Sequence, residues 1–354
     1  MAKKLKVFHG LVNYGTQAGL FAKELRNQGI IAISVVSRDL SKRQADIELL
    51  YGGNFTQKIF RHSWNRLRRF YWFFRYNTFH FYFGQTLFRN QRDLPFYKLL
   101  GKKIVMEYLG NDIRNYKTLV SRYNLPETHD YFQNQEEHDK KIAGRIDNEK
   151  KYLNYKICCL PTHIDFAKTY NYEIDDILPL AIDLEKIKFY PLVPKDKKEK
   201  IIILHAPTSR GFKGTLYVQM AIKRLIDEGY PVILKIAEGL THTELFDEYK
   251  KCDIFIDQIS VGWYGTAALE AMAVGRPTCA YIDERYFQYI DYANEIPIIN
   301  INKDNITEKL RNLLQNKKTF PIIGEKSRKF IKKHHDVVNV TKKLIDIYQN
   351  KLWN

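Results

Sequence analysis

Short apolar runs and amphipathic helical patterns alternate along almost the whole chain, and this alternation limits the folds open to it. Residues 5–8 predict a strand, residues 15–28 a helix with one apolar side, and residues 30–36 a buried strand rich in β-branched residues. A strand, a helix and a second strand in this order are typical of α/β proteins with parallel sheets. The same pattern predicts further strands and one helix at residues 79–83, 94–100 (helix), 103–108 and 153–161.

A proline- and lysine-rich stretch at residues 190–200 precedes a second run of the same pattern. A chain of 354 residues exceeds what one hydrophobic core usually serves, so we expect two domains. The predicted domains are residues 1–190 and 200–325, and residues 327–354 predict a C-terminal helix. In the second domain we expect strands at 201–204, 232–236, 253–257 and 277–282, and helices at 215–228, 243–251 and from Thr266 onward.

The formal net charge of +17 is unusual and indicates an anionic partner: nucleic acid, a membrane surface or a phosphorylated substrate. The four cysteines form neither a CxxC pair nor a metal-binding spacing, which favours buried thiols in a reducing compartment. The chain enters a predicted strand at once and lacks an apolar run of roughly 18 residues, so we expect no signal peptide and no membrane span.

The stretch WYGTAALEAMAVGRP, residues 263–277, predicts a small-residue helix that contains one carboxylate, Glu270. A helix start offers free N–H groups that suit phosphate, and Gly265 would let a ligand approach the backbone closely. Glu270, about one turn into the helix, could then accept hydrogen bonds from a diol such as a ribose. The alternative is a solvent-exposed glutamate on a surface helix.

A second candidate loop, HAPTSRGFKGT, follows the first strand of the second half and contains Arg210 and Lys213. Two cations three residues apart in a glycine-punctuated loop can be aimed at one diphosphate. Ligands of parallel α/β sheets gather at the carboxyl ends of strands, where both candidate loops are predicted to lie. The alternative is a basic surface turn.

Together these stretches resemble the nucleotide-sugar glycosyltransferases of the GT-B fold, in particular retaining enzymes of bacterial polysaccharide assembly. The resemblance is specific over residues 201–282, where the chain has an Arg and a Lys after the first strand and the helix LEAMAVGRP. It implies an α/β fold of two Rossmann-like domains facing each other across a cleft. It also implies the following roles: ribose binding by Glu270, neutralisation of the diphosphate by Arg210 and Lys213, and donor binding by Tyr264, Gly265, Thr266 and Ala267.

The chain departs from the family pattern at two places. The family has a second glutamate eight residues before Glu270, where this chain has Gly262, so recognition of the donor sugar differs and a retaining or an inverting course stays open. The family's histidine in the cleft is missing, because Tyr108 or Leu109 stands where it would fall.

The first half supports the resemblance through two further loops. Gly15 and Thr16 follow the first strand and would lie near the acceptor or the donor phosphate. In EYLGNDIR, Asn111 and Asp112 follow another predicted strand. Asp112 is a candidate catalytic residue that could orient an acceptor hydroxyl, and the alternative is that it caps a helix.

Residues 55–92 contain no Asp or Glu and mix arginines with aromatic residues. Residues 58–76 therefore predict a basic amphipathic helix that suits an anionic membrane surface. The alternative is that the aromatic side chains belong to the core and the arginines form a solvated rim. Single-stranded nucleic acid is disfavoured as a partner, because no known binding motif accompanies the mixture.

The resemblance implies transfer of a sugar from a nucleoside diphosphate to a hydroxyl of a glycan in bacterial surface polysaccharide assembly, and we expect this glycan to be lipid-linked. Residues 1–190 would bind the acceptor, residues 200–325 the donor, and residues 327–354 would return to the first domain. We expect no cofactor and no metal, since Arg210 and Lys213 would stabilise the leaving group. The expected location is the cytoplasm, with attachment to the inner face of the cell membrane. The alternative function is a non-catalytic scaffold of the same fold that binds membrane or a partner enzyme.

Overall fold

The computed structural model describes residues 4–37, 45–126, 134–194 and 199–353, and these form two compact units. Unit 1 contains Met1–Asn115, Glu136–Ala181 and Val337–Asn354, and unit 2 contains Tyr116–Gln135 and Ile182–Asp336. The sequence placed the domain boundary at residues 190–200, of which 195–198 lie outside the described residues. The place of Tyr116–Gln135 in unit 2 was not predicted. A return of the C-terminal residues to the first unit was predicted for 327–354, and the structure places only Val337–Asn354 there.

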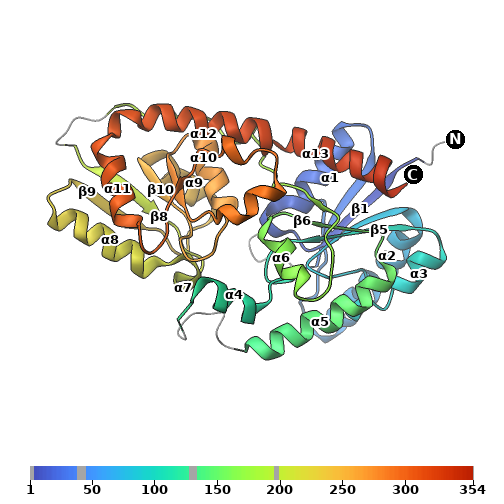
Figure 1. Cartoon of the computed structure of the whole chain (residues 1–354). Coiled ribbons are helices and arrows are strands. Elements are labelled where there is room, and N and C mark those ends of the chain that lie inside the picture. Colours follow the sequence, from blue (N-terminus) through green and yellow to red (C-terminus); the bar gives the residue numbers. More distant parts are fainter. Residues whose placement is uncertain (1–3, 38–44, 127–133, 195–198, 354) are drawn as a thin grey trace. The chain divides into compact units, whose positions relative to one another are not determined.

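Unit 1 is a seven-stranded parallel sheet in the order β3-β2-β1-β4-β5-β6-β7, with helices on both faces (Figure 1). Its strands are β1 (Lys6–Leu11), β2 (Ile31–Val36), β3 (Ile47–Glu48), β4 (Thr78–Tyr82), β5 (Lys103–Tyr108), β6 (Tyr155–Cys158) and β7 (Asp176–Ile177). Its helices are α1 (Gln17–Asn27), α2 (Phe55–Arg75), α3 (Leu94–Leu99), α5 (Gln135–Tyr152), α6 (Thr162–Lys168) and α13 (Val337–Asp346), followed by a π-helical turn at Ile347–Leu352.

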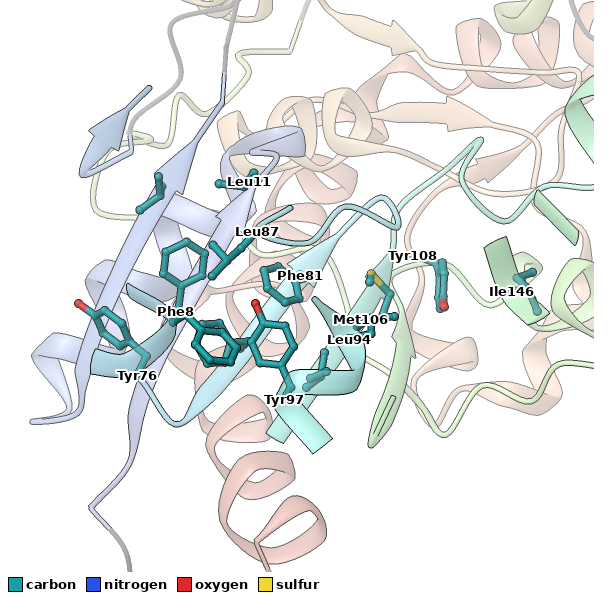
Figure 2. Packing of buried hydrophobic residues seen from close by; sticks show 14 of the residues in the cluster. Phe8, Leu11, Tyr76, Phe81, Leu87, Leu94, Tyr97, Met106, Tyr108 and Ile146 are labelled. Atoms are coloured by element: carbon teal, nitrogen blue, oxygen red, sulfur yellow. The ribbon is translucent and has the colours of Figure 1, made fainter. Parts of the chain in front are cut away.

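The strands of this sheet are apolar at successive positions because both faces are covered. Phe8 of β1 points to the face covered by α2, α3 and α5, whereas Val7 points to the face covered by α1 and α13. On the first face, aromatic rings fill most of the space, and Figure 2 shows Phe8, Phe81 and Tyr97 packed against one another. On the second face, α13, near the red end of the colour bar, lies beside α1 in Figure 1.

A chain of hydrogen-bonded polar side chains crosses the buried centre of unit 1. The His80 Nε2 lies 2.9 Å from the Glu107 Oε2, and the His80 Nδ1 lies 2.6 Å from the Tyr348 hydroxyl. The His9 Nε2 lies 3.5 Å from the same hydroxyl, and the His9 Nδ1 lies 2.7 Å from the hydroxyl of Tyr82. All five side chains are buried, so this chain joins three central strands to the C-terminal turn without contact with water.

Unit 2 is a five-stranded parallel sheet in the order β12-β11-β10-β8-β9. Its strands are β8 (Ile201–His205), β9 (Val232–Ile236), β10 (Ile254–Ile256), β11 (Thr278–Ala280) and β12 (Ile299–Asn300). Its helices are α4 (Tyr116–Tyr123), α7 (Arg210–Lys213), α8 (Thr215–Asp227), α9 (His242–Lys251), α10 (Thr266–Val274), α11 (Ile306–Gln315) and α12 (Phe320–His334). The chain order along the sheet reverses at β8, which has β9 on one side and β10 on the other.

The predicted single helix over the C-terminal residues is wrong. The helix α12 ends at His334 and α13 begins at Val337. The intervening His335 is buried, and its carbonyl accepts a hydrogen bond of 2.7 Å from the Ile182 backbone N–H. Because the His335 carbonyl bonds to Ile182 and not to a residue further along a helix, the helix is interrupted here. The chain passes from unit 2 to unit 1 at the same point.

Candidate functional site

The candidate site lies at the carboxyl ends of β8 and β10, where the strand order of unit 2 reverses. Such a reversal sends the two following loops to opposite sides and leaves a crevice between them, which is where α/β sheets bind ligands. His205, the last residue of β8, joins the two strands here, since its Nδ1 lies 2.9 Å from the carbonyl oxygen of Ile256. The loops that follow these strands contain both sequence motifs.

The loop after β8 forms the short helix α7, which presents Arg210 and Lys213. The Ser209 hydroxyl caps it by accepting a hydrogen bond of 3.3 Å from the Phe212 N–H, and Gly214 ends it at a φ of +71°. A Cβ at Gly214 would meet Ile259 at 2.4 Å, so both the backbone angle and the close approach require glycine.

Lys213 is buried and forms an ion pair with Asp257, the residue directly after β10. The Nζ of Lys213 donates to Oδ1 of Asp257, while Oδ2 accepts a hydrogen bond of 3.1 Å from the N–H of Gly265. One carboxylate thus connects the cation of the first motif to the helix start of the second. The strand predicted at 253–257 included Asp257 without a functional role, although an acid at the end of an apolar strand is a signal that could have identified it.

Arg210 is exposed and makes two hydrogen bonds to Glu238, from Nε at 2.8 Å and from Nη2 at 2.6 Å. Glu238 follows β9, so this pair connects the loops after β8 and β9. The Arg210 guanidinium holds the pKa of Glu238 below its ordinary value, mainly through the hydrogen bonds. Because the Arg210 side chain is 60% exposed, an anion in solution can reach its guanidinium.

Gly265, the residue before α10, has an extended backbone, and no side chain caps the start of the helix. Gly265, Thr266 and Ala267 are partly exposed. The space beside Gly265 is open, since the nearest atom to a Cβ placed there would be the Asp257 Oδ2 at 3.8 Å. The start of α10 thus offers N–H groups and the positive end of a helix dipole, an arrangement suited to phosphate.

Glu270 is buried at 8% exposure, one turn into α10. Its Oε1 lies 2.8 Å from the Nε2 of His242, the first residue of α9. The Tyr249 hydroxyl is buried beside the same carboxylate, and burial and the negative charge raise its pKa well above the ordinary value. The alternative of a solvent-exposed glutamate on a surface helix is therefore wrong.

Tyr264 does not present its side chain to a ligand. The ring is 1% exposed, stacks on Trp263 with a centroid distance of 5.2 Å, and places its hydroxyl 3.3 Å from the Nε2 of His335. The expectation that the Tyr264 side chain binds the donor is therefore wrong, because this side chain packs in the core of unit 2.

Gly262 has no room for a side chain. A Cβ there would meet the Asp283 Cβ at 2.3 Å and the Tyr123 hydroxyl at 2.9 Å. Asp283 is itself paired with Arg285, whose Nε donates to its Oδ1 at 2.9 Å. The glutamate that the enzymes resembled by residues 201–282 have at this position could not be accommodated without a shift of Asp283.

In unit 1 the candidate residues lie in two loops at the carboxyl edge of the sheet. The strand order of this sheet reverses at β1. Gly15 and Thr16 both have left-handed φ angles, of 53° and 65°, in the loop between β1 and α1. A β-branched residue rarely adopts this conformation, and such outliers are enriched at ligand sites. The amide of Gln17 holds the turn by donating to the carbonyl of Gly15 at 2.9 Å.

Asp112 holds its own turn and does not cap a helix, since α4 begins only at Tyr116. Its carboxylate accepts hydrogen bonds from the backbone N–H of Gly110 at 2.7 Å and of Leu109 at 3.1 Å, and the side chain is buried. Burial raises its pKa to about 6, against the opposing effect of Arg145. Asn111, by contrast, is exposed and accepts a hydrogen bond of 2.9 Å from Arg114.

Groups of three or more His, Cys, Asp or Glu side chains placed to bind a metal are not found among the described residues. The four cysteines, all of which are described, are buried and unpaired thiols. In the part of the chain that the structure describes, no helix has the length and apolar character needed to cross a membrane.

No protein-family model and no curated protein sequence matches this chain, whereas many solved structures share its fold. Sucrose-phosphate synthase from Thermosynechococcus elongatus is 13% identical with a TM-score of 0.65, over 99% of each chain. A putative UDP-N-acetylglucosamine 2-epimerase from Listeria monocytogenes is 12% identical with a TM-score of 0.56, over 99% of this chain and 97% of the other. WaaG, a glycosyltransferase involved in lipopolysaccharide biosynthesis, is 13% identical with a TM-score of 0.54, over 98% of this chain and 100% of the other.

These likenesses confirm the fold class expected from the sequence. The chain is an α/β protein with two parallel, Rossmann-like sheets, and the solved structures that it resembles over its whole length include glycosyltransferases of the GT-B fold.

Proposed function

We propose that the protein is a glycosyltransferase that transfers a sugar from a nucleoside diphosphate to a hydroxyl of a glycan, in assembly of a bacterial surface polysaccharide. The observation that carries the proposal is the Lys213–Asp257–Gly265 connection at the strand-order reversal of unit 2. It brings a buried cation and an uncapped helix start to one carboxylate. With Glu270 one turn further along the helix, the arrangement suits a diphosphate attached to a ribose.

In the proposed reaction, the bond between the anomeric carbon and the donor phosphate oxygen breaks, and its electron pair stays on the leaving diphosphate. The acceptor hydroxyl oxygen forms the new bond to that carbon and loses its proton. Lys213, Arg210 and the N–H groups at the start of α10 would stabilise the developing charge on the diphosphate. Because these groups are cations and amides of the chain, we propose that transfer needs no metal ion.

We propose that unit 1 binds the acceptor through the strained turn at Gly15 and Thr16 and the exposed Asn111. Asp112 then has a positioning role, because it fixes the turn from which Asn111 projects. Retention of configuration at the anomeric carbon is also proposed, on the resemblance of the 201–282 segment to retaining enzymes.

The helix α2 supports a proposal about the acceptor and the location. Asn54 caps it in a box with Gln57, and most of its large apolar side chains are exposed rather than buried. The exposed apolar residues on α2 are Phe55, Ile59, Phe60, Trp64, Leu67, Phe70, Tyr71 and Phe74. Six arginine and lysine side chains (Lys58, Arg61, Arg66, Arg68, Arg69, Arg75) and no acid accompany them on this helix.

A solvated rim around a core of aromatics does not describe α2, since of its aromatic residues only Trp72 and Phe73 are buried. We therefore propose that α2 lies in the interface of an anionic membrane on the cytoplasmic side, with its apolar side chains among the lipids and its cations at the headgroups. This location suits a lipid-linked acceptor.

The likeness to a putative 2-epimerase favours a second candidate, in which a nucleotide sugar is rearranged at C2 instead of being transferred. A scaffold without catalytic activity is the third candidate. All three share the fold, so binding and product analysis must separate them.

A thermal-shift panel with UDP, GDP, ADP and CMP on the wild type and on Glu270→Ala tests the nucleotide site. One nucleoside diphosphate should stabilise the wild type and not the variant. Incubation of the matching nucleotide sugars with lipid-linked glycans should then release the free diphosphate. Recovery of an epimerised nucleotide sugar would favour the epimerase instead, and absence of all nucleotide binding would refute both enzymes.

A further inference from the structure

The buried carboxylate of Glu270 contacts an exposed imidazole, that of His242. Glu270 is buried, while the His242 side chain that contacts it is 64% exposed. The Oε1 of Glu270 lies 2.8 Å from the His242 Nε2. Any ligand group that reaches this oxygen from solvent competes with the imidazole for it.

His242 is held in this position by the start of α9. The Thr241 hydroxyl accepts a hydrogen bond of 3.3 Å from the Glu244 N–H, and the Glu244 carboxylate accepts one of 2.7 Å from the Thr241 N–H. This capping box fixes the backbone directly before His242. The ring then packs edge-on against Phe246, one turn later, with a centroid distance of 4.9 Å.

The same helix face continues to Tyr249, whose buried hydroxyl lies beside Glu270. His242, Phe246 and Tyr249 are spaced by four and three residues, so they form one stripe of α9 that faces α10. The contact between His242 and Glu270 is therefore built by two helices, and it is not the chance meeting of two mobile side chains.

We propose that His242 is a specificity-determining residue of the nucleotide site: it occupies Glu270 in the free protein, and a vicinal diol displaces it. A diol can donate hydrogen bonds to both oxygens of the carboxylate, whereas the imidazole donates to one. A nucleotide without the diol leaves the pair intact and gains nothing from Glu270. This inference rests on the proposed function, because it assumes that the diphosphate binds at the start of α10.

Isothermal titration calorimetry with ribonucleotides and their dideoxy counterparts tests the inference on the whole protein. The probes are UDP, GDP and ADP, each beside its 2′,3′-dideoxy form. His242→Ala should tighten binding of the ribonucleotide that the wild type accepts, by roughly 2- to 10-fold, because displacement of one hydrogen bond is no longer required. Binding of the dideoxy form should not change.

His334→Ala is the matched control. His334 also belongs to unit 2 and its Nε2 lies 3.0 Å from a glutamate oxygen, that of Glu295, but neither residue belongs to the loops after β8 and β10. It should leave both affinities as in the wild type. His242→Asn, which is too short to reach Glu270, should reproduce the effect of His242→Ala if that variant folds poorly.

Weaker or unchanged binding of the ribonucleotide by both His242 variants would overturn the inference and would indicate that His242 contacts the ligand itself or has no part in the site. Equal tightening of the ribonucleotide and the dideoxy form would also overturn it, because the diol would then not be the competing group. If the wild type binds none of the three nucleotides, the proposed function fails together with the inference.

Discussion

Lys213 and Asp257 form the pair on which the proposed diphosphate site depends. Taking two charges out of water is costly, and a buried pair repays this cost only when both partners are present. Asp257 is almost completely buried and also accepts a hydrogen bond from the Gly265 N–H. Without Lys213 its carboxylate would be a buried charge with no compensating cation. The pair therefore links stability to the proposed chemistry, and the two effects must be measured separately.

Lys213→Ala should lower kcat for sugar transfer about 10²- to 10³-fold, the usual loss when one electrostatic donor is removed from a transition state. It should also lower the free energy of unfolding by about 3–5 kcal/mol, because Asp257 loses its cation. Turnover measured below the melting temperature, with urea unfolding beside it, checks both expectations.

The double variant Lys213→Ala with Asp257→Asn separates the two effects. It should recover much of the stability and none of the activity. Lys223→Ala, which removes an exposed lysine from α8, is the control and should change neither quantity. Near-normal turnover in the single variant would contradict a role of Lys213 at the leaving group.

Gly262→Ala should destabilise the protein by about 1–3 kcal/mol, because the added Cβ would meet the Asp283 Cβ at 2.3 Å. The comparison is Gly110→Ala, where a Cβ would have only ordinary contacts, the nearest at 3.8 Å. Urea unfolding of both variants checks the difference. Equal stability of the two would mean that Asp283 moves aside freely and that space does not explain the glycine at 262.

The sequence predicts Arg210, Lys213, Gly265 and Glu270 as candidate site residues because each stands in a local motif. It could not identify the residues that pair with them, namely Glu238, Asp257 and His242. A pair such as His242 with Glu270 joins side chains 28 positions apart, and no local spacing encodes that meeting. For the same reason Tyr264 was misjudged, since its buried contact with His335 joins distant parts of unit 2.

At the scale of helices and strands, the sequence predicted most of the sheets and of the helices that cover them. The apolar runs of β2 and β5 become strands that are buried along most of their length, whereas β9 is an edge strand whose side chains alternate between more and less exposed. The bounds of all three strands agree with the prediction to within a residue. The helices α4, α5, α6, α7 and α11 were not predicted. For α5 the reason is that it is polar on most of its surface and lacks a broad apolar stripe.

The buried polar chain of unit 1 should make stability depend on pH. Burial raises the pKa of Glu107 from 4.5 to about 8 and lowers that of His80 from 6.5 to about 3. Between pH 4.5 and 6.5 the folded pair holds one proton on Glu107 and the unfolded pair holds one on His80, so this pair contributes no slope. Above pH 6.5 the unfolded pair has lost its proton while the folded pair retains it up to about pH 8.

The free energy of unfolding should therefore fall by up to about 2 kcal/mol as the pH rises from 6.5 to 8. It should fall again below pH 4.5, where the unfolded pair binds two protons and the folded pair binds one. Urea unfolding of the wild type and of Glu107→Gln across this range checks the sign, because the amide cannot ionise. An unchanged slope above pH 6.5 in Glu107→Gln would contradict the assignment.

The exposed face of α2 should bind vesicles that contain anionic lipid. Replacing Phe60, Trp64 and Leu67 by Ser should weaken binding to vesicles of phosphatidylcholine and phosphatidylglycerol at least about tenfold, because each apolar side chain loses its burial among the lipids. Cosedimentation measures this. Replacing Leu216 and Met220, which are exposed on α8, by Ser is the control and should have no effect.

At the scale of the whole molecule, the residues proposed to bind the donor (Arg210, Lys213, Gly265, Thr266, Ala267 and Glu270) all belong to unit 2. A nucleoside diphosphate at about 100 times its dissociation constant should add about 2.7 kcal/mol to the free energy of unfolding of the unit that binds it. Calorimetry of the whole protein should therefore show that UDP, or the nucleotide found in the panel, raises the transition of unit 2. The unfolding transition of unit 1 can be recognised by its pH dependence, because the buried polar chain around Glu107 belongs to that unit. If the nucleotide raised only the unit 1 transition, the placement of the nucleotide site in unit 2 would be contradicted.

The composition of unit 1 has a consequence for the order in which the molecule is made. Its second face is covered in part by α13 and Tyr348, which follow β8 to β12 in the chain and are therefore synthesised after them. During translation, the apolar surfaces of Val7 and Phe21 that pack in the same cluster as α13 and Tyr348 stay exposed until those residues have left the ribosome. We therefore expect nascent chains that stop before Val337 to engage chaperones through unit 1, while unit 2 matures without them.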